Sequence, residues 1–137
     1  MGLDVTHDCW HGAYSAFARF REVVAAAAGF EMHEREPGDY TPRYWQPEWD
    51  GWATDAMLGG EWDQPPEDPL LVLLVHSDCD GVIPVKVAPF LAERLERLAP
   101  SVPETGAGHM PDARAAVLRF AAGLRSAAEA GDDVEFW

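Results

Sequence analysis

The chain has few basic residues and only one lysine. Lysine and arginine together number 10 among 137 residues, against 24 aspartate and glutamate residues, which gives a formal net charge of −14 at pH 7. Only Lys86 is a lysine, and the arginines form no long basic cluster. Because such a surface repels a nucleic-acid polymer or an anionic membrane, we exclude both as broad-face partners.

Cysteine and long hydrophobic runs are scarce as well. The two cysteines, Cys9 and Cys79, each lie in a polar stretch. No apolar run approaches the ~20 residues that cross a membrane, and residues 3–5 are too short for the apolar core of a secretory signal. We therefore expect a cytoplasmic protein with reduced thiols and no membrane partner.

The residues that are present predict one small α/β domain over residues 1–137, since 47% of them are hydrophobic and can form a core. Apolar periodicity predicts strands at 3–5, 70–75 and 134–137, and helices at 13–28, 53–58 and about 111–130. A further helix should begin between Pro84 and Pro89. Residues 31–69 are rich in proline and tryptophan, and we interpret them as an insertion or lid.

Two short segments hold most of the side chains suited to chemistry. The first motif is residues 6–12 (THDCWHG) and the second motif is residues 76–81 (HSDCDG). The chain thus contains two strand–motif–helix units, followed by a C-terminal helix and a short strand. Because side chains at the carboxyl ends of strands can converge on one pocket, we expect the motifs to share a site.

The residue types in these motifs favour a divalent metal. Imidazole and carboxylate groups bind Zn, Mn and Mg, and alternate residues of an extended chain point to one face. The alternative interpretation is that both motifs are polar turns whose side chains satisfy backbone groups. His109 either joins the same pocket or faces solvent from its loop. The expected metal ligands are His7, His11, His76 and Asp80, and the expected catalytic groups are Asp78, Asp80 and His109.

The second motif resembles two phosphatase signatures. Residues 74–83 (LVHSDCDGVI) are similar to the first motif of haloacid-dehalogenase-type phosphatases, and His76-x-Asp78-x-Asp80-Gly81 is similar to the opening metal motif of DHH-type phosphoesterases. The rest of the chain has no Asp-His-His triplet, and too little of it follows Asp80 for a haloacid-dehalogenase core. We therefore retain only the metal–carboxylate chemistry that the two families share.

A second resemblance covers most of the chain. Residues 7–17 (HDCWHGAYSAF) and the second motif resemble segments of small uncharacterised proteins from actinobacterial phages and their hosts. This resemblance implies a viral or mobile-element origin and a host cytoplasm, and it implies no activity.

Tryptophans gather in residues 45–62, where they are suited to stack on a planar ligand, with Arg43 as a nearby cation. Core packing and a partner-binding patch are the alternatives. The expected ligand-binding residues are Trp10, Arg43, Trp45, Trp49 and Trp52.

Two functions follow as hypotheses. The first is a metal-dependent hydrolase of a small phosphorylated or nucleotide-like molecule, with a metal-bound water as nucleophile. The second is a non-catalytic protein that sequesters a small host signalling nucleotide. A third interpretation is an interaction protein that uses its acidic surface. The sequence predicts no oligomeric state.

Overall fold

The computed structural model describes residues 2–34, 37–38, 44, 54–104 and 112–137. Helices and two small antiparallel sheets form around one hydrophobic core, which confirms the mixed α/β class. The elements in chain order are β1 (Gly2–Val5), β2 (Trp10–Ala13), α1 (Tyr14–Ala27), α2 (Asp55–Gly59), α3 (Leu70–Leu74), β3 (Val82–Ile83), α4 (Ala88–Leu98), the 3-10 helix η1 (Ala99–Ser101), α5 (Ala113–Ala130) and β4 (Val134–Glu135).

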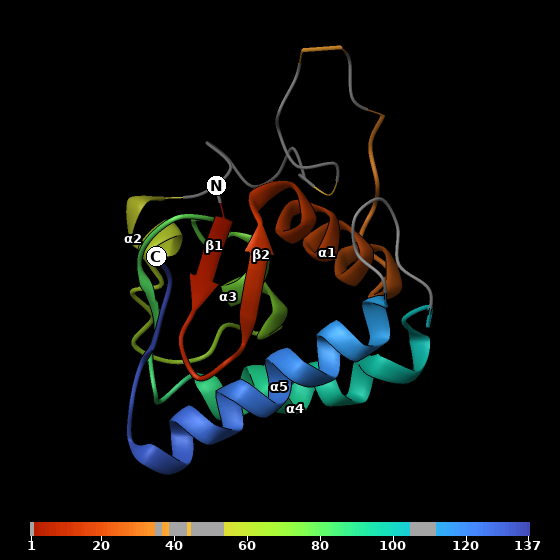
Figure 1. Cartoon of the computed structure of the whole chain (residues 1–137). Coiled ribbons are helices and arrows are strands. Elements are labelled where there is room, and N and C mark those ends of the chain that lie inside the picture. Colours follow the sequence, from red (N-terminus) through yellow and green to blue (C-terminus); the bar gives the residue numbers. More distant parts are fainter. Residues whose placement is uncertain (1, 35–36, 39–43, 45–53, 105–111) are drawn as a thin grey trace.

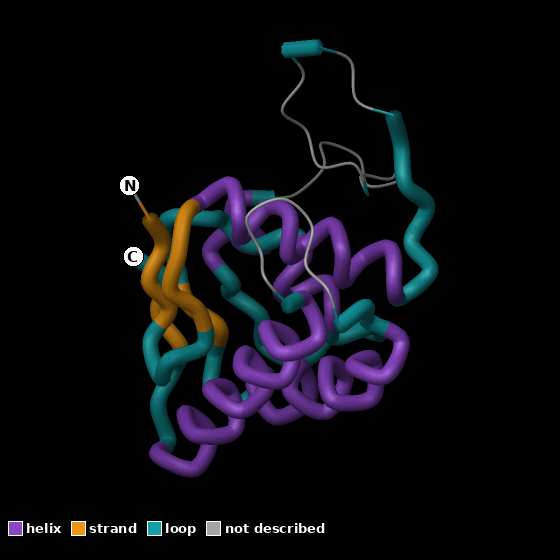
Figure 2. The backbone as a smooth tube through the Cα atoms, turned by 45° about the vertical axis from the view of Figure 1, so that its right-hand side comes forward, coloured by secondary structure: helices purple, strands orange, loops and turns teal. Residues whose placement is uncertain are grey.

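The strands lie together on one side of the molecule, on the left in Figures 1 and 2. β1 pairs with β2, and β3 pairs with β4. The C-terminal segment connects the two pairs, since Asp4 and Trp137 exchange two backbone hydrogen bonds of 2.9 Å and Phe136 donates to the Gly81 carbonyl. The start of β1 and the end of the chain therefore lie side by side.

Helices α4 and α5 pack against each other and run antiparallel beneath the strands and α1 (Figure 1). Asp112 caps the start of α5 by accepting from the Ala115 N–H, and Gly131 ends it with a φ of 74°, a conformation that glycine adopts without a steric cost. The side chains of Val117, Phe120 and Leu124 on α5 point into the core.

An aromatic cluster in the core joins elements that are distant in the sequence. Trp10 of β2 lies 5.3 Å from Phe17 and 5.1 Å from Phe20, both on α1. Phe20 stacks on Phe120 of α5, and Phe17 meets Phe136 of the C-terminal segment edge-on. Such ring pairs contribute about 0.5–1.5 kcal/mol each beyond their burial, so this cluster stabilises the packing of β2, α1 and α5 against one another.

The prediction of a buried strand at residues 70–75 is wrong, because Leu70–Leu74 forms the helix α3. Asp68 accepts from the Leu70 N–H at 3.0 Å, and Pro69 precedes the first helical residue. Both features favour a helix start. The second motif therefore follows a short helix, and the repetition of a strand–motif–helix unit is wrong.

The other expected elements are confirmed with small shifts at their ends, including the strand at 3–5, the helices at 13–28 and 53–58, and the helix starting near Pro89. Within the described part of the chain, none of the helices combines the length and apolarity that crossing a bilayer requires. Trp62 packs against the core. The interpretation of residues 31–69 as a lid stays a prediction, because residues 35–36, 39–43 and 45–53, which include three of its tryptophans, lie outside the described residues.

Candidate functional site

The first motif forms a tight hairpin turn between β1 and β2. His7 and Asp8 both have positive φ angles, of 58° and 61°, and the Cys9 N–H donates to the Thr6 carbonyl at 3.3 Å. Positive φ at both central residues is the geometry of a type I′ turn, which matches the twist of the flanking strands. The backbone turns here, so the expectation of an extended chain with alternate residues on one face is wrong for this motif.

The side chains of this turn bind α5 and the residues that follow it. Arg119 Nη2 donates to the Asp8 carboxylate at 2.6 Å, and Arg119 Nε donates to the Asp8 carbonyl at 3.0 Å. His7 Nε2 lies 3.1 Å from the Asp132 carboxylate. His11, an exposed residue of β2, pairs instead with the Asp4 carboxylate of β1. The contacts of Arg119 and Asp132 attach the hairpin to α5 and to the residues that follow it. Each of the two histidines already has an acidic partner.

Cys9 is enclosed between the hairpin and α5. A Cβ atom added at Gly123 of α5 would lie 2.5 Å from Cys9 Sγ and 2.8 Å from the His7 carbonyl oxygen, so only glycine permits this approach. The pKa of the Cys9 thiol is raised to about 12, mainly by burial; the Asp8 carboxylate also raises it and Arg119 lowers it. The neutral thiol is a poor nucleophile and a poor metal ligand.

In the second motif, His76 is buried and contacts the backbone of its own loop. Its side chain is 2% exposed and stacks on Phe136 with ring centroids 3.9 Å apart. Its Nδ1 lies 2.7 Å from the Ser77 carbonyl oxygen and its Nε2 lies 2.9 Å from that of Val82. Burial lowers the pKa of His76, and the two carbonyl contacts oppose that effect. Both ring nitrogens face carbonyl oxygens at short distance, and the neutral ring donates to one of them, so neither nitrogen is open to a metal in this conformation.

Arg21 is a functional candidate that the sequence did not reveal. Although it is charged, it is 8% exposed. Its Nη1 donates to the carbonyls of Leu73 and His76 at the end of α3, and its guanidinium carbon lies 4.8 Å from the Phe17 ring centre. Tyr44 donates to the Leu74 carbonyl at 2.9 Å. Burial raises the pKa of Tyr44, with Arg21 lowering it and Glu22 and Asp78 raising it.

The second motif borders a hollow of about 330 Å³, which we call the Asp80 hollow. Asp78 and Asp80 are exposed at this hollow, and Ser77 Oγ accepts from the Cys79 N–H nearby at 3.3 Å. The described residues that line it are Arg21, Leu58, Leu74, Val75, His76, Ser77, Asp78 and Asp80.

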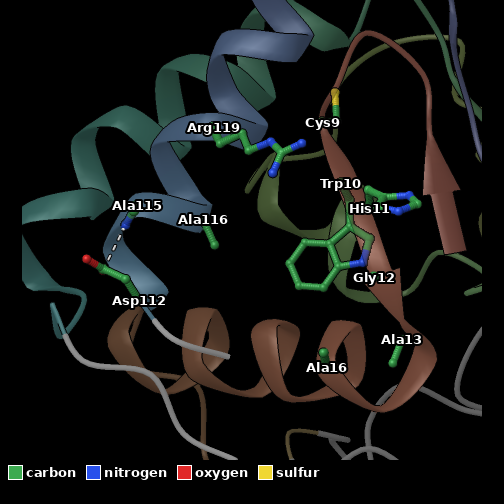
Figure 3. Close-up of a pocket in the computed structure, with 10 residues that line it drawn as sticks. All are labelled: Cys9, Trp10, His11, Gly12, Ala13, Ala16, Asp112, Ala115, Ala116 and Arg119. Atoms are coloured by element: carbon green, nitrogen blue, oxygen red, sulfur yellow. Dashed lines mark hydrogen bonds between the residues drawn. The ribbon is translucent and has the colours of Figure 1, made fainter. Parts of the chain in front are cut away.

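The first motif borders a different hollow, of about 410 Å³, between β2, α1 and α5, which we call the Trp10 hollow (Figure 3). Figure 3 shows Arg119 and Ala116 on α5, the Trp10 ring on β2 and Ala16 on α1 around this space. The described residues that line it are Cys9, Trp10, His11, Gly12, Ala13, Ala16, Asp112, Ala115, Ala116 and Arg119.

Trp10 combines a buried ring with an unused donor. The residue is 8% exposed, and its Nε1 is buried with no hydrogen-bond partner among the described residues. Nε1 lies on the Gly12 side of the ring, 3.6 Å from where a Cβ at Gly12 would be. A buried indole N–H normally finds an acceptor, so Trp10 retains an unsatisfied polar group next to this hollow.

The two motifs do not converge on one pocket, since they line separate hollows. Among the described residues, no three histidine, cysteine, aspartate or glutamate side chains are grouped so as to hold a metal ion. The expected ligands His7, His11 and His76 pair with Asp132, with Asp4 and with two carbonyls respectively. Asp80 remains exposed, and a metal there stays a prediction.

Several expected site residues fall outside the described residues. They are the catalytic candidate His109 and the ligand-binding candidates Arg43, Trp45, Trp49 and Trp52. Their roles stay predictions. Two cations that the sequence did not single out, Arg21 and Arg119, instead line the two hollows. A signal for Arg21 was present, because it lies one helical turn after Phe17 and next to Phe20 on an apolar face.

We compared the chain with protein-family models, with curated proteins and with solved structures, and none of them matches.

Proposed function

We propose that the protein binds a small planar molecule with an anionic group, such as a nucleotide, in the Trp10 hollow and holds it without turnover. The observation that supports this proposal is the composition of that hollow. Its volume of about 410 Å³ lies in the usual range for small-molecule sites, which are mostly apolar with a few placed polar groups.

The apolar part of the hollow suits a flat ring. The Trp10 ring and the methyl groups of Ala16, Ala115 and Ala116 supply apolar surface from three elements. A planar ring that enters between them loses contact with water on both faces, which contributes roughly 25 cal/mol per Å² of apolar surface.

The polar part of the hollow suits an anion. Arg119 Nε and Nη2 bind Asp8, while Nη1 has no partner among the described residues. Arginine hydrogen bonds to phosphate or carboxylate oxygens are charge-assisted and strong. His11 at the rim adds a second donor. The resemblance to phage proteins makes a host nucleotide the first ligand to test.

The experiment measures binding of AMP, GMP and adenosine by titration calorimetry and by thermal shift. Ala116→Leu fills the hollow with a larger side chain, and its matched control is Ala122→Leu, at an exposed position on the same helix. Arg119→Gln removes the cation, and its control is Arg125→Gln, which lies on α5 away from the hollow. We expect both hollow variants to weaken nucleotide binding by about tenfold or more and both controls to leave it unchanged.

Three outcomes would contradict this proposal. No binding by any of the three probes would exclude a nucleotide. Equal binding by wild type and Ala116→Leu would place the ligand elsewhere. Conversion of AMP or GMP to a new product during incubation, detected by chromatography, would show that the protein is an enzyme and does not merely bind the nucleotide.

A metal-dependent hydrolase is the second candidate. The observation that favours it is that the Asp78 and Asp80 carboxylates border one hollow. Its support is smaller, because the three histidines expected to complete the metal site have other partners. Stoichiometric metal in protein purified without a histidine tag, and its loss in Asp80→Asn, would support this function.

A further inference from the structure

Arg21 carries a buried charge that no carboxylate of the described residues neutralises. Its Nη1 bonds to two carbonyls, and its Nε is buried without an acceptor within the described part of the chain. Glu22, the adjacent acid, pairs with Arg19. A buried cation without an anion is costly, and the negative end of α3 and the Phe17 ring offset only part of that cost.

The remaining guanidinium nitrogen is Nη2, which has no partner among the described residues. Because Arg21 lines the Asp80 hollow and Nε is buried, Nη2 is the nitrogen that a ligand in this hollow can reach. An oxyanion at Nη2 would supply the missing negative charge through a charge-assisted hydrogen bond.

The same hollow also carries negative charge. Asp78 and Asp80 line it and are exposed, and their side chains hydrogen-bond to no other described side chain. The hollow thus presents one fixed cation and two carboxylates. A simple anion would be repelled by the carboxylates, and a simple cation would be repelled by Arg21.

We propose that the Asp80 hollow binds a small zwitterion of the free amino acid type, with its carboxylate on Arg21 and its ammonium group on Asp78 and Asp80. The volume of about 330 Å³ is at the lower end of small-molecule sites. Leu58, Leu74 and Val75 supply an apolar wall for the ligand side chain. This site is separate from the Trp10 hollow and does not depend on the function proposed there.

The experiment screens the free proteinogenic amino acids one at a time by thermal shift, followed by calorimetry for the best binder. The same amino acid is then tested as its N-acetyl derivative, which lacks the ammonium group, and as its amide, which lacks the carboxylate. We expect each derivative to bind at least about tenfold more weakly than the parent zwitterion, because each loses one charge-assisted contact.

The variants assign the contacts to residues. Asp78→Asn and Asp80→Asn are exposed substitutions that we expect to weaken binding by about tenfold each. Asp63→Asn is the matched control, since Asp63 is exposed outside the hollow, and it should bind as wild type does. Arg21→Lys keeps the positive charge but lacks the planar guanidinium group, so we expect it to bind the amino acid more weakly. The thermal midpoint of the unliganded variant shows whether it still folds.

The following results would overturn the proposal. No thermal shift with any amino acid excludes the ligand class. The ammonium contact is excluded if the wild-type protein binds the N-acetyl derivative as tightly as the parent amino acid. It is also excluded if Asp80→Asn binds the parent amino acid as tightly as wild type does. Binding of MgCl₂ or MnCl₂ that requires Asp80, without amino acid binding, assigns the hollow to a metal and supports the hydrolase. Loss of nucleotide binding at the Trp10 hollow leaves this result unchanged, so the two proposals fail separately.

Discussion

The two cysteines illustrate how the surroundings of a residue determine its chemistry. Cys9 and Cys79 occur in similar Asp-Cys contexts in the two motifs. Cys9 is buried against α5, and burial raises its pKa to about 12. Cys79 is exposed. At pH 8, a thiol with a pKa near 12 is thiolate in only about one molecule in 10⁴.

We therefore expect a disulfide reagent such as 5,5′-dithiobis(2-nitrobenzoate) to modify one thiol per folded chain at pH 8 and two in denaturant. Absorbance at 412 nm counts the released thiolate. Cys79→Ser should abolish the reaction of the folded protein, while Cys9→Ala should leave one fast thiol. Two equally fast thiols in the folded wild type would disprove the burial of Cys9.

His76 shows what the sequence could and could not predict about the site. Its position before Asp78 and Asp80 favours a ligand or catalytic role, since imidazole and carboxylate groups are typical of such sites. Its ring instead supports the Ser77 and Val82 carbonyls and stacks on Phe136, which is 60 residues further along the chain. No local pattern reports a contact formed by the C-terminal segment. The motif was visible from the sequence, and the direction of its side chains was not.

At the scale of elements, two helix-ending glycines have the same backbone but different neighbours. Gly60 ends α2 with a φ of 77°, and Gly131 ends α5 with a φ of 74°. A Cβ at Gly60 would lie 1.6 Å from the Val82 carbonyl oxygen and 3.0 Å from His76 Nε2, whereas one at Gly131 would meet nothing within 4 Å. Gly60 is therefore required for the close approach of α2 to the second motif.

The pair provides a matched test by urea denaturation. Gly131→Ala should lower the free energy of unfolding by about 1–2 kcal/mol, which is the steric cost of a left-handed alanine. Gly60→Ala carries the same cost, and its Cβ also displaces the loop at Val82, so we expect a loss at least about 3 kcal/mol greater. Equal losses in the two variants would show that α2 does not pack against the loop in this way.

The elements also show where sequence reasoning about the fold succeeds. Long helices with end signals, such as α1 and α5, were predicted because their apolar spacing and terminal glycines are local features. α3 was missed because a short apolar run fits a strand or a helix equally well, although Asp68 and Pro69 are helix-start residues. Its end is satisfied by Arg21 and Tyr44, which lie far away in the sequence. β2 was missed because His7-Asp8 is not the Asn-Gly pair that announces a type I′ turn.

At the scale of the whole molecule, the net charge of −14 acts against the folded state. Surface ion pairs relieve part of this repulsion, including Arg119 with Asp8, Arg114 with Glu104 and Arg125 with Glu96. Exposed pairs of this kind contribute only about 0–1 kcal/mol each. With 24 acidic and 10 basic residues, most carboxylates have no cation to pair with, so unbalanced repulsion should dominate the response to salt.

We expect the thermal midpoint to rise by about 2–5 °C when NaCl is raised from 10 to 200 mM, because screening shortens the reach of repulsion from about 30 Å to below 10 Å. Differential scanning calorimetry measures this shift. KCl should act as NaCl does if ionic strength is the cause. Arg125→Gln removes one ion pair and makes the net charge more negative, so its midpoint should start lower and rise more steeply with salt. A midpoint that falls as salt is added would contradict this expectation, because it would mean that attraction within the surface ion pairs outweighs repulsion among the carboxylates.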